Sequence, residues 1–481
     1  NLSISIGSLS DLRIIPSIFV PPKSIPNIIM NIKFYYLGKN IIFMNNKKVF
    51  SWSISVALAG FLFGFDTVVI SGANLPIKEL WNTSPIFHGV FIMSMALWGT
   101  VLGSVFGSIP CDKIGRKNTL IWIGILFFVS ALGSAIAPDP YSFSFFRFIG
   151  GVGVGVSSVA SPTYISEISN RKNRGKLVAL YQFNIVLGIL IAFFSNYLLI
   201  GFGGDLDWRY MLGIEAIPAF IYILSVLGVP KSPRWLILFK NDIDSARKVL
   251  TLIYDKKEIQ NKIEEIQNSI NNKKSENLFS GVFNHQIKLA FLLAFFNQLS
   301  GINFILYYAP EILQTAGFAT SDSLMSSVSI GFVNLIFTLV GLRLIDNYGR
   351  KNLMFVGSIG YIISLFTIAI CFIYQLDPFV LLFFILIFIS SHAIGQGTVI
   401  WVFISEIFPN HMRARGQSFG SAVHWIFAAL ITAVTPTVIN ILGNNPGMVF
   451  YGFGIMMILQ LIFVIKMMPE TKGISLEKIN F

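Results

Sequence analysis

Asp112-Lys-Ile-Gly-Arg-Lys117 follows one long apolar stretch of this chain, and Asp346-Asn-Tyr-Gly-Arg-Lys351 follows another in its second half. A second motif also occurs twice, as Tyr164-Ile-Ser-Glu-Ile168 and Phe403-Ile-Ser-Glu-Ile407, and arginines come soon after each copy. One copy of either motif would be consistent with an ordinary charged turn. Two motifs that recur in the same order indicate two matching halves, as in membrane proteins whose parallel repeats rock about a central site.

The composition excludes several common classes of protein. Of 481 residues, 54% are hydrophobic and only 12% are charged, whereas average soluble domains carry about 25% charge. So few charges cannot cover the surface of a soluble protein, which excludes an ordinary cytosolic enzyme, a disordered chain and a nucleic-acid-binding module. The net charge of +12 instead fits basic loops of a membrane protein. Cys111 and Cys371 indicate neither a disulfide framework nor a metal site.

Twelve apolar segments are long enough to cross a bilayer, since a spanning helix needs roughly 20 apolar residues. The expected spans are 50–75, 86–110, 118–138, 141–168, 176–200, 210–229, 286–316, 324–346, 351–374, 378–408, 414–442 and 447–468. The one long polar stretch, 231–285, has Ile and Leu at helical spacing. We therefore expect an all-α integral membrane protein: twelve transmembrane helices in two six-helix pseudo-symmetric bundles, joined by short cytoplasmic helices.

The expected domain boundaries follow from these spans. Residues 1–43 are rich in Ile, Pro and Ser without a helical period, and we interpret them as a disordered or non-native extension. The first bundle takes 44–230, the linker 231–285, the second bundle 286–468 and a cytoplasmic tail 469–481.

Lys and Arg residues are concentrated in the loops on one side of the expected membrane. They follow the second, fourth, eighth and tenth spans, whereas the opposite loops are poorer in them. Because such residues mark cytoplasmic loops, both termini are expected in the cytoplasm of a multi-pass cell-membrane protein.

Two charged side chains lie inside apolar spans: Asp66 in the first and Arg147 in the fourth. A carboxylate there costs roughly 2.5–3.5 kcal/mol on insertion scales, so it is a functional candidate. An aspartate that gains and loses an arginine partner as helices move can take up and release a proton. The alternative is a static, structural ion pair.

Neutral amides and tryptophans also lie within the spans: Gln182, Asn297, Gln298, Asn303, Asn334, Trp401 and Trp425. Such groups suit a sugar, whose hydroxyls need neutral donors and acceptors and whose ring faces stack on aromatic rings. Residues 297, 298 and 303 do not share one helical face, but a helix break at Ser300-Gly301 would aim them together. Any single amide has the alternative role of holding helices together.

These residues belong to motifs that resemble the sugar porter family of the major facilitator superfamily. The resemblance runs from about Trp52 to Lys478 and is strongest to bacterial sugar–proton symporters of the xylose type. It rests on both Gly-Arg-Lys motifs and on Gly64-Phe-Asp-Thr67, Arg147-Phe-Ile-Gly-Gly151, Ser232-Pro-Arg-Trp-Leu236, Gln298-Leu-Ser-Gly-Ile-Asn303 and Pro469-Glu-Thr-Lys-Gly473. Together these motifs are specific, although each alone would be weak.

The resemblance implies roles for individual residues. It gives proton coupling to Asp66, Arg147 and Glu215. It gives sugar contact, or a place in the lining or gate of the site, to Phe63, Gln182, Asn297, Gln298, Asn303, Tyr307, Asn334, Gly397, Trp401, His424 and Trp425.

Three of these positions depart from the family pattern. Asn297 replaces a second Gln, His424 replaces an amide, and Gly397-Thr398 replaces Gly-Pro. For this reason the resemblance does not identify the sugar. His424 is either a second titratable group or, as we favour, a plain hydrogen-bonding group.

The charged motifs at the span ends are expected to form ion pairs that hold the cytoplasmic side closed. These residues are Asp112, Arg116, Glu167, Arg171, Arg174, Asp346, Arg350, Glu406, Arg413 and Arg415. Lys231 stands where the family has Glu, so one of these interactions should be weakened or missing.

The expected function is secondary active transport: a monosaccharide (hexose, pentose or inositol) enters with a proton by alternating access. The proton is the coupling ion, and no other cofactor is expected. A facilitative sugar uniporter of the same fold is the main alternative, and a sugar-sensing receptor is less favoured. An enzyme is not expected, since no metal cluster, nucleophile–base pair or phosphate loop is visible. The expected partners are the sugar and membrane lipid, not nucleic acid, and the protein is expected to be a monomer.

Overall fold

The computed structural model describes residues 47–170, 173–254, 257–268, 278–409, 412–443 and 445–473, and every regular element within these ranges is a helix. The expected extension at 1–43, Arg171, and residues 474–481 of the expected tail lie outside them.

The first half contains the helices α2 to α10. They are α2 (Lys47–Leu80), α3 (Pro85–Phe87), the π-helix η3 (His88–Met93), α4 (Met95–Phe106), α5 (Ser108–Lys113), α6 (Arg116–Ile136), α7 (Pro140–Ile168), α8 (Arg174–Leu199), the 3₁₀ turn η4 (Gly204–Leu206), α9 (Asp207–Gly213) and α10 (Ala216–Leu227).

Three short helices follow: α11 (Pro233–Lys240), α12 (Ile243–Leu250) and α13 (Ile259–Asn268). The second half consists of α14 (Asn284–Leu299), α15 (Ile302–Thr315), α16 (Thr320–Tyr348), α17 (Arg350–Ile373), α18 (Pro378–Ile394), α19 (Gln396–Ile407), α20 (Arg413–Ile441) and α21 (Gly447–Lys466).

Several expected spans are built from two consecutive helices. Eleven helical segments of the described chain are long and apolar enough to cross a membrane, and α9–α10, α14–α15 and α18–α19 each make one of them. A twelfth span is the pair Pro85–Met93 and Met95–Phe106, which is bent by 40°. The expected all-α membrane fold is confirmed, with a break in the second span that the apolar pattern did not predict.

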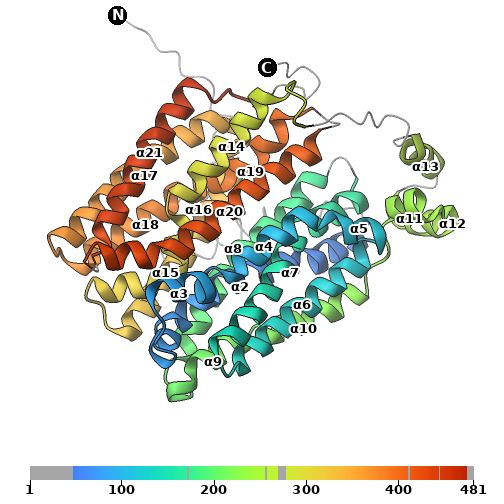
Figure 1. Cartoon of the computed structure of the whole chain (residues 1–481). Helices are drawn as coiled ribbons and strands as arrows, with labels where there is room; N and C mark the ends of the chain where they lie inside the picture. Colours follow the sequence, from blue (N-terminus) through green and yellow to red (C-terminus); the bar gives the residue numbers. More distant parts are fainter. Residues whose placement is uncertain are drawn as a thin grey trace, which may run out of the picture.

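The two halves lie side by side as separate groups of helices, coloured blue to green and yellow to red in Figure 1. They touch mainly where α8 packs on α16, where α2 packs on α15, and where η3 and α4 pack on α20. Functional groups on α2, α8, α14, α16, α19 and α20 can therefore meet between the halves.

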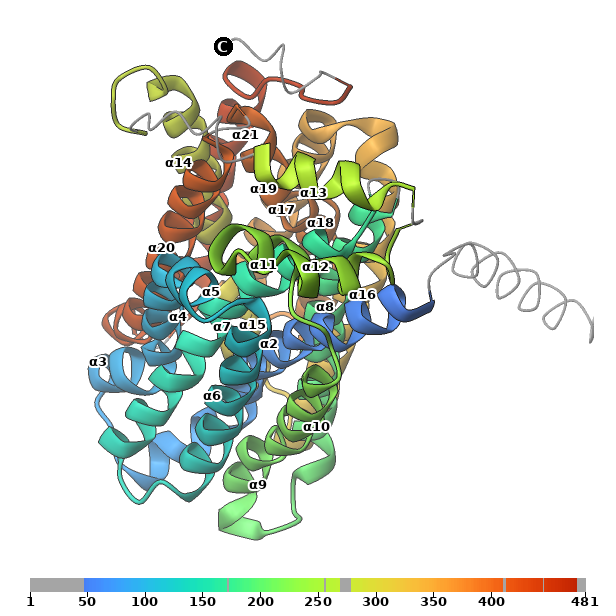
Figure 2. The same ribbon diagram turned by 90° about the vertical axis from the view of Figure 1, so that its right-hand side faces the viewer.

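The helices α11, α12 and α13 lie at one end of the molecule, far from α9 at the other end (Figures 1 and 2). Their buried face includes Trp235, Leu236, Ala246 and Ile263, which form a small hydrophobic cluster. The Trp235 Nε1 donates to the Asp112 carbonyl at 2.9 Å, which holds α11 against the first half. The expected short helices between the halves are thus present.

The start of α7 is set by Asp139, whose Oδ1 accepts from the backbone N–H groups of Tyr141 (2.9 Å) and Ser142 (3.1 Å). Pro140 follows at the first helical position, where a missing N–H costs nothing. Hydrogen bonds from Ser142 hold the pKa of the Asp139 carboxyl below its ordinary value. This cap fixes the register in which α7 carries Arg147 into the first half.

Candidate functional site

A buried ion pair lies in the first half, between α2 and α7. Arg147 donates through one terminal nitrogen to Asp66 Oδ1 and through the other to the Asp66 carbonyl, at 2.9 Å. The side chains of both residues are only 2% exposed. Glu215, at the N-cap of α10, is also buried and interacts electrostatically with both of them. The structure therefore brings all three expected proton-coupling residues together.

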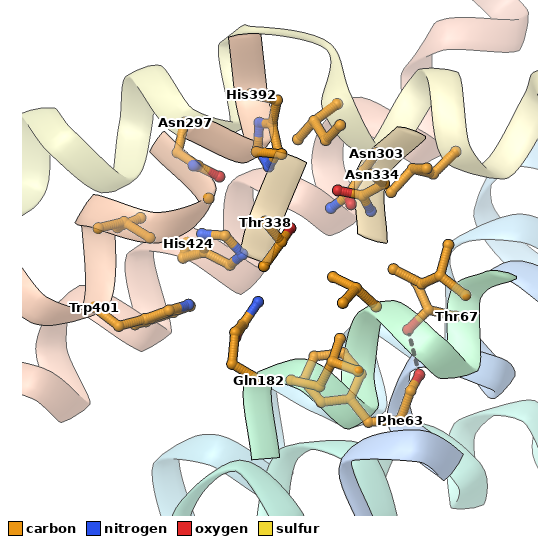
Figure 3. A pocket seen from close by; sticks show the side chains of 18 of the residues that line it. Phe63, Thr67, Gln182, Asn297, Asn303, Asn334, Thr338, His392, Trp401 and His424 are labelled. Carbon is orange, nitrogen blue, oxygen red and sulfur yellow. Dashed lines mark hydrogen bonds between the residues drawn. The ribbon is translucent and has the colours of Figure 1, made fainter. Parts of the chain in front are cut away.

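A cavity of about 120 Å³ lies between the two halves (Figure 3). Phe63, Thr67 and Gln182 reach it from the first half, and the second half supplies the remaining polar groups. Its further lining includes Ile185, Val186, Ile189, Asn297, Gln298, Ile302, Asn303, Leu306, Asn334, Thr338, His392, Ala393, Gly397, Ile400, Trp401, His424 and Trp425. Except for Tyr307, every residue expected at the sugar site lines this one cavity.

The amides of the second half converge because the helix breaks where the sequence suggested. α14 ends at Leu299 and α15 begins at Ile302, with Gly301 at a φ of +82° that favours glycine. Across this break Asn303 Nδ2 donates to Gln298 Oε1 at 2.9 Å. Gln298 Nε2 in turn donates to Asn297 Oδ1 at 3.0 Å. The three amides thus form one connected group on the cavity wall.

Aromatic rings complete the wall around His424. Its ring centroid lies 5.0 Å from that of Trp401 and 4.7 Å from that of Trp425. Gln298 Nε2 lies 3.0 Å from His424 Nε2, so the imidazole is held by the amide group as well. Phe63 approaches Trp425 from the first half, with 5.6 Å between ring centroids. Planar aromatic and amide surfaces alternating in this way suit a polyhydroxylated ring.

His392 and Thr338 line the cavity but were not expected from the sequence. His392 Nδ1 lies 2.5 Å from the Tyr361 hydroxyl, which fixes the orientation of the imidazole. The signal available was a histidine inside an apolar span, and this alone does not distinguish a cavity wall from a buried structural site.

Asp66 and Tyr307 do not line the cavity, although their neighbours Thr67 and Leu306 do. Tyr307 instead faces the ion pair and interacts electrostatically with Arg147 and Asp66. On each of α2 and α15, one residue therefore lines the cavity while its neighbour lies at the ion pair. A shift of either helix affects both the cavity and the ion pair.

Two matching charged networks join span ends. In the first half Arg116 binds Asp112 at 3.0 Å and Glu167 at 3.1 Å, and Ser232 donates to Glu167 at 2.5 Å. In the second half Arg350 binds Asp346 at 3.3 Å and Glu406 at 2.8 Å. Thr471 donates to Glu406 at 2.6 Å, in the role that Ser232 has in the first half. The expected tail thus begins with residues that bind back to the second half.

The repeat is broken at one position. Glu470 accepts from the backbone N–H groups of Arg350 and Lys351, both at 3.0 Å, and so caps α17. The corresponding residue in the first half is the exposed Lys231, and no side chain among the described residues caps α6. Arg413 interacts electrostatically with Glu406. Arg174 begins α8, and Arg415 lies in the first turn of α20.

The sequence model of the family described as "Sugar (and other) transporter" matches residues 52–481. The chain belongs to this sugar transporter family. The expected resemblance to sugar porters of the major facilitator superfamily is therefore confirmed, and the expectation of a transporter rather than an enzyme is confirmed with it.

This sugar transporter is similar along nearly all of its length to curated relatives. It is 34% identical over 437 residues to an arabinose-proton symporter of Bacillus subtilis, covering 89% of this chain and 93% of that one. It is 32% identical over 474 residues to a D-xylose-proton symporter of Escherichia coli, covering 91% of this chain and 96% of that one.

Solved structures of the xylose transporter XylE from E. coli have the same fold as this sugar transporter. Its inward-open conformation matches with a TM-score of 0.80 at 32% identity, over 90% of this chain and 99% of that one. The structure of XylE bound to 6-bromo-6-deoxy-D-glucose matches with a TM-score of 0.76, also at 32% identity, over 90% of this chain and 98% of that one.

A polar network that was not expected from the sequence joins the two halves of this sugar transporter far from the charged motifs. Asn74 on α2 donates to Glu311 on α15 at 2.6 Å. The Asn74 Oδ1 lies 2.6 Å from His88 Nε2, and the Thr83 hydroxyl lies 2.8 Å from His88 Nδ1. Lys78 approaches Glu311 at 3.5 Å. Only Glu311 belongs to the second half, so this network closes the interface at one end.

Proposed function

We propose that this protein is a secondary active transporter that carries a monosaccharide into the cell together with a proton by alternating access. The carrying observation is the buried Asp66–Arg147 pair next to a cavity walled by amides and aromatic rings. The printed names of its relatives, an arabinose-proton and a D-xylose-proton symporter, support both the proton and the sugar.

The proton is proposed to bind at Asp66. In a buried site the arginine cannot be deprotonated, so the charge of the pair changes only at the carboxylate. When helix movement separates Asp66 from Arg147, a carboxylate left without its partner favours protonation, and re-pairing favours release. Glu215 is proposed to assist as the neighbouring second carboxylate. No cofactor beyond the proton is proposed.

The sugar is proposed to bind in the cavity between the halves. The residues proposed to contact or enclose it are Phe63, Gln182, Asn297, Gln298, Asn303, Asn334, Gly397, Trp401, His424 and Trp425, whereas Tyr307 is proposed to act at the ion pair. Thr67 and Leu306 line this cavity, whereas their chain neighbours are Asp66, which belongs to the ion pair, and Tyr307, which faces the pair. Thr67 and Leu306 are therefore proposed to couple the cavity to the ion pair. Sugar binding and proton binding can thereby act on the same two helices, α2 and α15.

The proposed arrangement in the cell places both termini in the cytoplasm of a monomer in the cell membrane. The bundles are proposed to be 44–230 and 286–468, with 231–285 as the cytoplasmic linker and 469–481 as the tail. The networks around Arg116 and Arg350 then lie on the cytoplasmic side, and with Arg171, Arg174, Arg413 and Arg415 they are proposed to favour its closure. The network around Asn74 lies on the outer side.

Transport by the purified protein in proteoliposomes tests this proposal. The substrates are D-xylose, L-arabinose, D-glucose and myo-inositol, each with and without a pH gradient that is acidic outside. We expect at least one sugar to accumulate above its external concentration, and a protonophore to abolish the accumulation. A sugar that only equilibrates, whatever the gradient, would identify a uniporter. No movement of any sugar would contradict the substrate class.

A further inference from the structure

Three buried polar atoms around the Asp66–Arg147 pair have no hydrogen-bond partner among the described residues: Ser130 Oγ, Arg147 Nε and Glu215 Oε1. Ser130 is 1% exposed and lies on α6, which packs against α7. An unpaired buried hydroxyl is costly, so each one needs an explanation, of which a functional role is one. The proposed proton-coupling mechanism gives Ser130 no role.

Gly150 shows how close Ser130 is to the pair. A Cβ atom built at Gly150 would lie 2.3 Å from Ser130 Oγ and 3.3 Å from Asp66 Oδ1. The serine hydroxyl and the carboxylate therefore both pack against the Cα of Gly150, an approach that a side chain at residue 150 would prevent. Rotation about one side-chain bond of Ser130 moves its hydroxyl relative to the carboxylate.

The other groups that face Asp66 are two charged side chains and one phenol. In the described chain these are Arg147 on α7, Glu215 at the start of α10 and Tyr307 on α15. Arg147 can only donate hydrogen bonds, and an ionised Glu215 can only accept them. The Tyr307 and Ser130 hydroxyls are neutral, and each can both donate and accept; Ser130 is the one that approaches from α6.

We propose that Ser130 is a positioning residue for proton binding at Asp66. The hydroxyl is unpaired while Asp66 binds Arg147. When the two separate, it turns to donate to the charged carboxylate, and it accepts from the carboxyl once Asp66 is protonated. The serine keeps its own hydrogen throughout, and the transported proton comes from water and returns to water. This inference deepens the proposed function and rests on it.

Loss of the Ser130 hydroxyl is expected to change the proton affinity of Asp66 in one direction. A hydrogen bond to an ionised acceptor is stronger than one to a neutral group, so its removal weakens the charged form of Asp66 more. The protonated form is then favoured, and proton-driven uptake persists to a higher external pH. One charge-assisted hydrogen bond corresponds to a shift of about 1 pH unit in the midpoint of uptake.

The test measures pH-gradient-driven sugar uptake in proteoliposomes over a range of external pH at a fixed gradient. The variants are Ser130→Ala, Ser130→Cys, whose thiol is a weaker donor, and Ser130→Thr, which keeps the hydroxyl. The matched control is Ser364→Ala on α17, because Ser364 is also buried but donates to carbonyls of its own helix. Binding of the sugar to each purified variant checks that it is folded.

We expect the midpoint to shift upward in Ser130→Ala, to shift less in Ser130→Cys, and to stay near the wild-type value in Ser130→Thr and Ser364→Ala. Wild-type midpoints in both Ser130→Ala and Ser130→Cys would overturn the role of Ser130 while leaving proton coupling intact. Equal shifts in Ser130→Ala and Ser130→Thr would also overturn it, since the shape of the site and not the hydroxyl would then matter. If the wild type itself shows no proton-driven uptake, the proposed function fails first.

Discussion

At the scale of single residues, His424 joins the amides of the cavity to its aromatic rings. It touches Gln298 through a ring nitrogen and lies between Trp401 and Trp425. The imidazole therefore orients the amide of Gln298. A ring without a hydrogen-bonding nitrogen cannot replace it in this role.

We predict that His424→Phe raises the KM for sugar by roughly 2–12-fold, because one hydrogen bond worth about 0.5–1.5 kcal/mol is lost while the aromatic contact is kept. His424→Gln, which keeps a hydrogen-bonding group, should lie closer to the wild type. Uptake kinetics of the three proteins under one imposed pH gradient measure this. An unchanged KM in His424→Phe would show that the imidazole does not orient the site.

The residues that sequence reasoning found are those whose chemistry is out of place in lipid. Asp66 and Arg147 were identifiable because each is a charge in an apolar span, and the two indeed pair. His392 was missed since a histidine in a helix gives no sign of which neighbour it faces. Tyr307 was expected at the cavity but faces the ion pair, because adjacent residues of a helix point in directions about 100° apart.

At the scale of helices, the spans were predictable and several of their breaks were not. The expected spans were identified from the length and the apolar composition of each segment, and both can be read directly from the sequence. It did not show that η3 would bend the second span or that Glu215 would separate α9 from α10. The break at Ser300-Gly301 was predictable because the polar residues on either side of it did not fit one helical face.

The network around Asn74 connects α2, η3 and α15, and its position gives a prediction about helix movement. Asn74 is fully buried and holds both Glu311 and His88, so Asn74→Ala leaves the buried His88 and the half-buried Glu311 without that partner. We predict that this substitution opens the Asn74 end of the interface about tenfold more often, because roughly 1.4 kcal/mol of hydrogen bonding is lost.

The measurement is the rate at which an impermeant thiol reagent labels Leu306→Cys on the cavity wall from the Asn74 side of the membrane. Cys111 and Cys371 are replaced by Ala in this background so that only the new thiol reacts. Asn118→Ala is the control, since Asn118 is exposed and its amide donates to the carbonyl of Ile114, just before its own helix. Equal labelling rates in the Asn74 and Asn118 variants would contradict a gate at this network.

At the scale of the whole molecule, the repeat seen in the sequence corresponds to two charged networks with the same layout. Arg116 with Glu167, and Arg350 with Glu406, hold equivalent helix ends in the two halves. The repeat predicted this equivalence, and the resemblance to the family predicted the exception at Lys231. The repeat could not predict how the halves meet, because the contacts between α8 and α16 and between α2 and α15 involve surfaces that the repeat does not relate.

The central claim is that Asp66 carries the proton that accompanies the sugar. The most direct measurement is the internal pH of dye-loaded proteoliposomes when sugar is added outside with no imposed gradient. We predict that the wild type acidifies the interior and that Asp66→Asn does not, although Asp66→Asn still exchanges labelled for unlabelled sugar across the membrane. Acidification by Asp66→Asn at the wild-type rate per sugar transported would contradict the claim.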